Sequence, residues 1–278
     1  MTLPVLGCVA TLTGFAGLAQ AQTNDSAEGF LAALSSIPLA TVVDGTTWLE
    51  LEYGDPAAAL PVASLGAIQG LRHHDDPARL AASRGTQQAW AQVFLATDPA
   101  AMRAAIGLGP ADFGRNLALR LGRAQMAMVV FQPEAAPALQ AAIAAGGYQT
   151  DTRQGHPVWW RGDEDRATDP DARDPANPFG GNLGLASRFF IADSHLYWTS
   201  EWPMLDRVLS GGDGLNSHPA LAALGAALQA EGQGALVYAY AILWPSAEEG
   251  APDLTDLLTF GRSEGGLLAA AMVADLVA

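Results

Sequence analysis

Strand and helix signals alternate most clearly over residues 126–161, MAMVVFQPEAAPALQAAIAAGGYQTDTRQGHPVWWR. Residues 126–131 are apolar and predict a strand, and residues 133–145 predict a helix that ends at a glycine pair. Residues 148–152 and 156–161 then flank a glycine-containing turn, which predicts a hairpin. The segment therefore specifies a strand, a helix and a hairpin in succession.

The rest of the chain carries similar signals. On the N-terminal side we expect one strand at 46–53 and then helices over 56–123. Asp-Pro pairs in that region place a capping carboxylate before a proline suited to the first helical turn. On the C-terminal side we expect a hairpin at 187–192 and 195–199, helices at 201–209, 219–230 and 253–260, and strands at 235–244 and 266–277.

These elements predict an α+β fold, with a mainly antiparallel sheet and helices packed on it. The sheet would be built from repeated strand–helix–hairpin units, with a helical insertion in the N-terminal half. We divide the chain into a signal peptide at 1–21, a largely helical region with one strand at 22–124, and a sheet region at 125–278. The last two regions are expected to form one continuous globular unit.

The first residues predict export. An apolar run from Leu3 to Leu18 is followed by Ala19-Gln20-Ala21, the small-x-small pattern of a signal peptidase site. We therefore expect a bacterial Sec-type signal cleaved after Ala21 and a periplasmic or secreted protein. An uncleaved anchor is the alternative, but the run is short and contains glycines, so we expect no transmembrane span in the mature chain.

Cys8 is the only cysteine and lies inside this predicted leader. Lipidation of Cys8 is the alternative, because Val5-Leu6-Gly7-Cys8 loosely matches a lipobox, although few residues precede it. Cleavage after Ala21 leaves a mature chain without cysteine. That excludes disulfides, thiolate catalysis and cysteine-ligated metal centres.

Composition excludes further classes of function. The chain has 14 Lys+Arg and 29 Asp+Glu, a formal net charge of −15, and every cation is arginine. Without lysine there is no Schiff-base enzyme, P-loop lysine or Ser–Lys dyad. The acidic balance argues against a nucleic-acid partner. Gly-x-Ser-x-Gly, His-Glu-x-x-His and Gly-x-Gly-x-x-Gly motifs are missing, so we predict a non-enzymatic protein that uses no cofactor.

Two segments carry a family resemblance. They are Gly146-Gly-Tyr-Gln-Thr-Asp-Thr-Arg-Gln-Gly-His-Pro-Val-Trp159 and Ile191-Ala-Asp-Ser-His-Leu-Tyr-Trp-Thr-Ser-Glu-Trp-Pro-Met-Leu-Asp-Arg-Val-Leu209. Both resemble segments of exported bacterial proteins of unknown function that are built from repeated strand–helix–hairpin units. The resemblance is a pattern of residue types, and it implies fold and export. That family has no established catalytic residues, so no functional residue is carried over.

Two groups of side chains resemble metal ligands. His73 and His74 are adjacent, so on a helix their imidazoles would point about 100° apart, unlike the i, i+4 spacing of helical zinc sites. The loop at 162–174 is acidic but lacks the spacing and central glycine of a calcium-binding EF-hand loop. We expect Arg166 and Arg173 to pair with its carboxylates, and no metal site.

These groups still define a second hypothesis. An extracytoplasmic metal-dependent hydrolase could use His73, His74 and the carboxylates at 163–174. A catalytic set of His156, His195 and Ser200 is a weaker alternative. A third hypothesis is a fragment of a longer structural envelope protein, because the last predicted strand runs almost to the final residue.

Strand alternation separates two faces over 156–199. The expected core face consists of Val158, Trp160, Phe189, Ile191, Leu196 and Trp198. The opposite face consists of Trp159, Arg161, Arg188, Phe190, His195 and Tyr197. Aromatic residues and arginines dominate binding hot spots, which makes this second face the candidate binding surface. The alternative is that helices from 56–123 cover it, with arginine heads reaching water.

The leading hypothesis is an exported, non-enzymatic binding or envelope-associated protein. Its predicted ligand-binding residues are Trp159, Arg161, Arg188, Phe190 and Tyr197. The predicted partner is a protein or an anionic small molecule.

Overall fold

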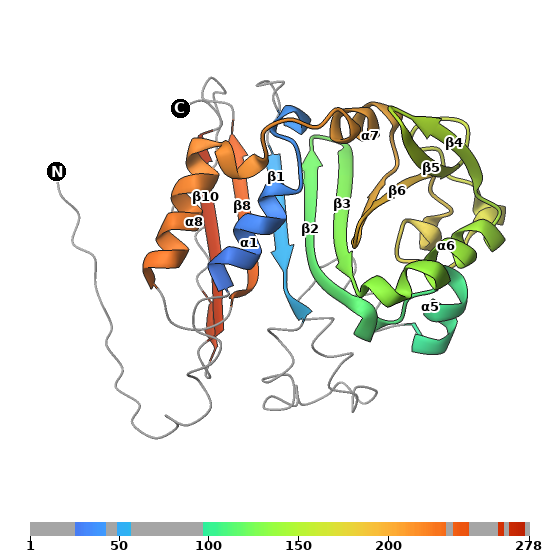
Figure 1. Ribbon diagram of the computed structural model, residues 1–278, viewed down its shortest axis with the longest axis horizontal. Helices are drawn as coiled ribbons and strands as arrows, with labels where there is room; N and C mark the ends of the chain where they lie inside the picture. Colours follow the sequence, from blue (N-terminus) through green and yellow to red (C-terminus); the bar gives the residue numbers. More distant parts are fainter. Residues whose placement is uncertain are drawn as a thin grey trace.

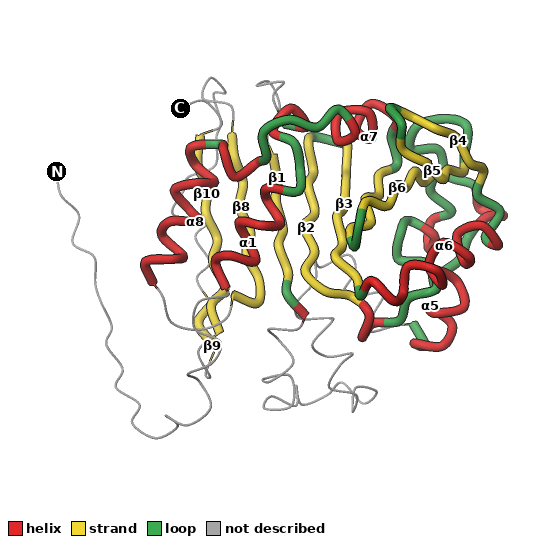
Figure 2. The backbone as a smooth tube through the Cα atoms, viewed as in Figure 1, coloured by secondary structure: helices red, strands yellow, loops and turns green. Residues whose placement is uncertain are grey.

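The computed structural model describes residues 26–42, 49–56, 97–231, 236–244, 261–263 and 267–275. In these ranges the chain forms one sheet with α-helices on both sides (Figure 1, Figure 2). The helices are α1 (Ser26–Ser35), α5 (Pro99–Ile106), α6 (Ala136–Ala145), α7 (Trp202–Leu209) and α8 (Pro219–Glu231). The strands are β1 (Leu49–Gly54), β2 (Phe113–Leu121), β3 (Ala124–Phe131), β4 (Gln149–Arg153), β5 (His156–Arg161), β6 (Ser187–Ala192), β7 (His195–Thr199), β8 (Leu236–Trp244), β9 (Gly261–Ser263) and β10 (Leu267–Asp275).

The sheet confirms the predicted α+β class. Its ten described strands lie in the order β4-β5-β6-β7-β3-β2-β1-β8-β10-β9. Neighbouring strands are antiparallel, apart from the parallel pair β8 and β10. β3, α6 and the β4–β5 hairpin form the predicted strand–helix–hairpin succession. β1 and β2, from the N-terminal region, belong to the same sheet.

β3 separates two hydrophobic cores. Its side chains Met126 and Met128 belong to the first core, whereas Ala127 and Val129 belong to the second. This is the alternation expected of a strand that is covered on both faces. α1, α7 and α8 cover the first face, and α5 and α6 cover the second. Figure 1 shows α1 and α8 next to one another across β8 and β1, and α5 and α6 together beside the β3–β6 end.

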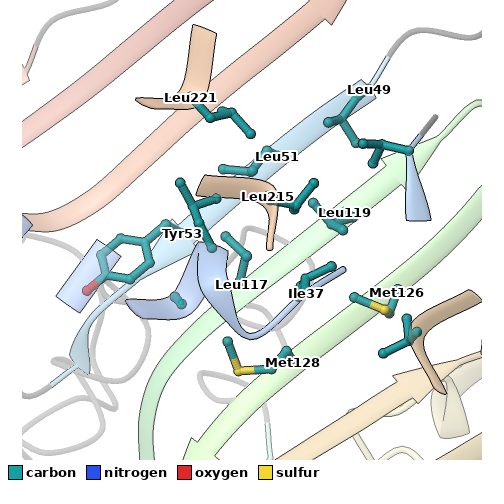
Figure 3. Close-up of a cluster of buried hydrophobic side chains, with 14 of the residues drawn as sticks. Ile37, Leu49, Leu51, Tyr53, Leu117, Leu119, Met126, Met128, Leu215 and Leu221 are labelled. Carbon is teal, nitrogen blue, oxygen red and sulfur yellow. The ribbon is translucent and has the colours of Figure 1, made fainter. Parts of the chain in front are cut away.

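Leucine is the most frequent residue of the first core. Figure 3 shows Leu51 of β1 and Leu119 of β2 beside Ile37 and Leu215, which follow α1 and precede α8. All four side chains are buried. Burial of such a side chain contributes about 1.5–3 kcal/mol. The helices are therefore held to the sheet by apolar contacts.

The strand β2 corrects the prediction that residues 56–123 are helical. Leu117, Leu119 and Leu121 are buried while Arg120 is exposed, which is the two-residue period of a strand. β1 and β3 pair with β2 along both of its edges, and this pairing outweighs the helix propensity of leucine and alanine. Most of the remaining predicted helical region, and the predicted helix at 253–260, lie outside the described residues.

The Asp98-Pro99 pair starts α5 as predicted. The Ala101 amide donates a hydrogen bond of 3.3 Å to the Asp98 carboxylate, and Pro99 is the first helical residue. The helix ends at Gly107, whose φ of 74° is left-handed. A Cβ at this position would overlap the backbone carbonyl of Ala138 in α6. Glycine therefore allows α5 to lie close against α6.

Candidate functional site

The predicted binding residues do not share one face of the sheet. β5 pairs with β6 so that Val158 is opposite Phe190 and Trp159 is opposite Phe189. Residues directly opposite one another in an antiparallel pair point to the same face. The prediction that placed Trp159 on the same face as Phe190 is therefore wrong.

The five residues are divided between the two cores. Trp159 and Arg161 lie on the second-core face, whereas Arg188, Phe190 and Tyr197 lie on the first-core face. The cause is a one-residue difference in register, which moves every side chain of a strand to the other face. The connection from β5 to β6 is long, so no tight turn sets this register from local sequence.

On the second-core face, Trp159 and Arg161 make internal contacts. Trp159 is half-buried and packs against the second core. The Arg161 guanidinium lies 5.0 Å from the centre of the Tyr148 ring, a cation–π contact. The Tyr148 hydroxyl accepts a 3.2 Å hydrogen bond from the Asn177 amide. Burial raises the pKa of Tyr148, and the positive charge of Arg161 opposes this shift.

On the first-core face, Phe190 and Tyr197 are buried. Their rings stack with centroids 4.3 Å apart and an interplanar angle of 1°. The Tyr197 hydroxyl donates a 3.1 Å hydrogen bond to the carbonyl of Ser36, just after α1. Burial raises the pKa of Tyr197 to about 12. This pair forms part of the contact between the sheet and α1, so neither ring is presented to a partner.

The histidine and serine candidates are not brought together. His156 lies beside Phe190 and His195 beside Tyr197, with ring centroids 5.9 and 6.2 Å apart. Ser200 follows the opposite end of β7 from His195, roughly 16 Å away at the usual rise of an extended strand. Burial lowers the pKa of His195, and the nearby Asp193 opposes this shift. The geometry does not assemble a Ser–His catalytic pair from these residues.

Arg188 is fully buried, with a side-chain exposure of 0%. Its guanidinium donates to three backbone carbonyls, those of Arg161 (3.3 Å), Gly162 (3.0 Å) and Glu164 (3.2 Å). The Asp165 carboxylate lies 3.5 Å from the same group. Burial lowers the pKa of Arg188, and Asp165 opposes this shift. Arg188 therefore holds the start of the connection that follows β5.

Arg188 is also part of a cluster that the sequence did not indicate. We define the arginine–tryptophan cluster as Arg153, Trp160, Arg188 and Trp202. The Arg153 and Arg188 guanidinium carbons lie 3.7 and 5.0 Å from the centre of the Trp202 ring. The Trp160 and Trp202 rings meet edge to face, with centroids 5.9 Å apart. The cluster joins β4, β5 and β6 to the first turn of α7.

Carboxylates surround this cluster. Asp206 accepts hydrogen bonds of 3.1 and 3.2 Å from Arg153. Asp165 accepts a 2.9 Å hydrogen bond from the backbone amide of Trp202. Glu201, which precedes Trp202, lies 3.2 Å from the Arg166 guanidinium. Burial raises the pKa of Glu201, and the charge of Arg166 opposes this shift.

Three members of the cluster reach the surface. Trp160 and Trp202 are partly exposed, and the Arg153 side chain is 31% exposed. Arg188 lies beneath them and is inaccessible. The surface thus presents two indole rings and one guanidinium that are held by neighbouring groups before any partner arrives. Such groups lose little conformational entropy on binding, which favours contact with another molecule.

Trp160 and Trp202 are not among the binding residues predicted from the sequence. Strand alternation places Trp160 in the expected core set, and Trp202 falls inside the predicted helix 201–209 with no binding role. The detectable signal is Trp202-Pro203 directly after the β6–β7 hairpin, which places an aromatic ring at the first turn of α7. Arg153 flanks the turn between β4 and β5, and its approach to Trp202 depends on tertiary packing.

The acidic connection at 162–174 is held differently from the prediction. Arg166 pairs with Glu201, outside the segment, and Arg173 donates to the carbonyl of Asn182. Asp169 and Asp174 accept hydrogen bonds from nearby backbone amides, as turn-forming residues do.

In the described part, no group of three or more His, Cys, Asp or Glu side chains is placed to hold a metal ion. His73 and His74 lie outside the described residues.

The chain matches no family model, no curated protein and no solved structure. The resemblance to exported bacterial proteins therefore stays a prediction. Of the helices in the described ranges, none combines the length and apolar character needed to cross a membrane.

Proposed function

We propose that this protein is an exported, non-enzymatic binding or envelope-associated module whose partner is a polypeptide. The contact surface consists of Arg153, Trp160 and Trp202. The observation that carries the proposal is the pair of partly exposed tryptophans, whose rings meet edge to face while the Arg153 guanidinium lies over the Trp202 ring. Tryptophan and arginine are the residues that most often dominate protein–protein binding energy.

Local charge favours a polypeptide over an anionic small molecule. Arg153, the one accessible guanidinium of the surface, is already paired with Asp206 and lies near Asp151. An anion would have to approach these carboxylates and compete with them. A peptide that places apolar side chains against the indole rings meets no such repulsion.

Export is supported by the apolar leader and the Ala19-Gln20-Ala21 pattern. Its test is N-terminal sequencing of the protein from the periplasmic and medium fractions of the producing cells. We expect a mature chain that starts at Gln22. A full-length chain retained in the cytoplasm would contradict export.

Binding is tested by a photo-reactive amino acid placed at one of two exposed hairpin turns. Gln154, between β4 and β5, adjoins the cluster, whereas Arg123, between β2 and β3, is the matched control. Irradiation of the producing cells should yield one cross-linked protein of defined mass from position 154 and none from position 123. Equal labelling at both positions, or none at 154, would count against the proposed surface.

A substitution of Trp202 tests whether the cross-link depends on the indole ring. Trp202→Ala should abolish the cross-link formed from position 154, while far-ultraviolet circular dichroism checks that the chain remains folded. If Trp202→Ala does not fold, Trp160→Leu removes one indole and keeps an apolar side chain. A cross-link unchanged in the folded variants would show that the tryptophans are not the contact.

A further inference from the structure

β4 is the end strand of the described sheet. It pairs with β5 along one edge, and no described strand pairs with the other. Four of its five residues are exposed and the fifth, Arg153, is partly exposed. An end strand offers unpaired backbone donors and acceptors to any strand that approaches, so folded proteins protect such edges.

The hairpin turn identifies which groups point outward. Gln154 and Gly155 have φ values of 50° and 84°, the left-handed pair of a type I′ turn. The flanking residues Arg153 and His156 are opposite one another. In this turn the flanking pair shares both hydrogen bonds, and pairs then alternate along the ladder. The N–H and C=O groups of Thr152, and those of Thr150 two residues earlier, therefore point away from β5.

The outward donor of Thr152 is already occupied. The Thr152 amide donates a 2.7 Å hydrogen bond to the Asp151 carboxylate. The other carboxylate oxygen of Asp151 lies 3.7 Å from the Arg153 guanidinium. Arg153 is in turn held by Asp206 and by the Trp202 ring. Arg153, which is itself held in place, therefore keeps the Asp151 carboxylate over the Thr152 N–H.

We propose that Asp151 protects the outer edge of β4 at Thr152 against strand addition by a second copy of this chain. Two β4 strands can meet antiparallel about Thr152, so that each Thr152 N–H would bond the other copy's Thr152 carbonyl. Facing threonines are a favourable cross-strand pair. The Asp151 carboxylate occupies the place of the incoming carbonyl and repels it electrostatically.

The test is the association state of Asp151→Ala, measured by sedimentation velocity over a range of concentrations. We expect the wild-type chain to remain monomeric and the variant to form dimers, with association strengthened by about tenfold or more, or about 1.4 kcal/mol. Asp171→Ala is the matched control, because it removes one exposed carboxylate from the connection at 162–174, outside β4. It should remain monomeric.

A second substitution shows whether the dimer uses this edge. Asp151→Ala/Thr152→Pro lacks the outward N–H and should return to monomer, since proline is tolerated on end strands. If Asp151→Ala does not fold, Asp151→Val is used instead and is likewise expected to form dimers. Two results would overturn the proposal: Asp151→Ala that associates no more than Asp171→Ala, or a wild-type dimer that Thr152→Pro dissociates.

Discussion

The guanidinium carbon of Arg153 lies 3.7 Å from the centre of the Trp202 ring. Arg153 ends β4 and Trp202 begins α7, so the contact joins the β4–β5 hairpin, at one end of the described sheet, to a helix of the first core. The same guanidinium is bound by both carboxylate oxygens of Asp206. The hairpin is therefore anchored by a planar cation held between a ring and a carboxylate.

Replacing Arg153 should weaken this anchor. We expect Arg153→Ala to lower the free energy of unfolding by about 1–2 kcal/mol, because it removes a stacked cation and a charge-assisted hydrogen bond. Arg153→Lys should recover only part of the loss, since an ammonium does not stack as a planar group. Urea unfolding at low ionic strength measures both changes.

Arg120→Ala is the control for a simple surface ion pair. Arg120 lies 3.1 Å from Glu50 and its side chain is 53% exposed. Exposed pairs of this kind contribute roughly 0–1 kcal/mol. A cost for Arg153→Ala no greater than for Arg120→Ala would mean that the stack on Trp202 adds nothing to stability.

Arg188→Ala should be more damaging than any exposed arginine substitution. It leaves the carbonyls of Arg161, Gly162 and Glu164 without their buried donor, and we expect a loss of about 3 kcal/mol or more. Arg123→Ala, at an exposed turn, should leave stability unchanged. The melting temperature of each variant is the measurement. An unaltered value for Arg188→Ala would contradict a role in holding this connection.

Tyr197 should make stability fall at alkaline pH. An unfolded tyrosine ionises near pH 10, whereas the pKa of folded Tyr197 is raised to about 12. Unfolding therefore releases a proton in this range, and stability is lost as pH rises from about 10 towards 12, by up to roughly 2–3 kcal/mol. Because the chain has no lysine, no lysine titration overlaps this range.

Tyr197→Phe should remove that part of the alkaline loss. It also removes the hydrogen bond to Ser36, which should cost about 1 kcal/mol at neutral pH. Urea unfolding at intervals between pH 9 and about 11.5 separates the two effects. Tyr148→Phe is the comparison variant. It should still show the part of the alkaline loss of stability that is due to Tyr197. If the unfolding free energies of wild type and Tyr197→Phe fall in parallel as the pH rises, the raised pKa of Tyr197 is contradicted.

A comparison of Gly107→Ala with Gly211→Ala should separate the cost of steric overlap from the cost of backbone strain. Gly107 and Gly211 both have positive φ, but an added Cβ overlaps Ala138 at the first and meets no atom within 4 Å at the second. Gly211→Ala should cost about 1–2 kcal/mol, and Gly107→Ala should cost more because α5 must move away from α6. Equal changes in unfolding free energy would mean that this overlap relaxes freely.

Most of the correctly predicted elements are marked by local sequence signals, such as turn residues and helix caps. The β4–β5 turn at Gln154-Gly155 and the β6–β7 turn at Asp193-Ser194 carry residues suited to positive φ, so both hairpins were located from sequence. The capping Asp98 located α5 in the same way. Each of these features depends on residues within one turn of the chain.

The missed features depend on contacts between distant residues. The Leu117, Leu119 and Leu121 alternation in β2 is a strand signal, but it was outweighed by the surrounding helical pattern. The register of β5 against β6 follows a long connection that Arg188 and other buried groups hold in place. A one-residue error there divided the predicted site between two faces and concealed the contact of Trp160 with Trp202.

The position of β3 between two cores has a consequence for cooperativity. Met128 belongs to the core under α1, α7 and α8, and its neighbour Val129 belongs to the core under α5 and α6. Local opening of either helical layer leaves the other packed on β3. The amide protons of this strand should therefore exchange with solvent only when the whole sheet unfolds, and they report the global stability of the chain.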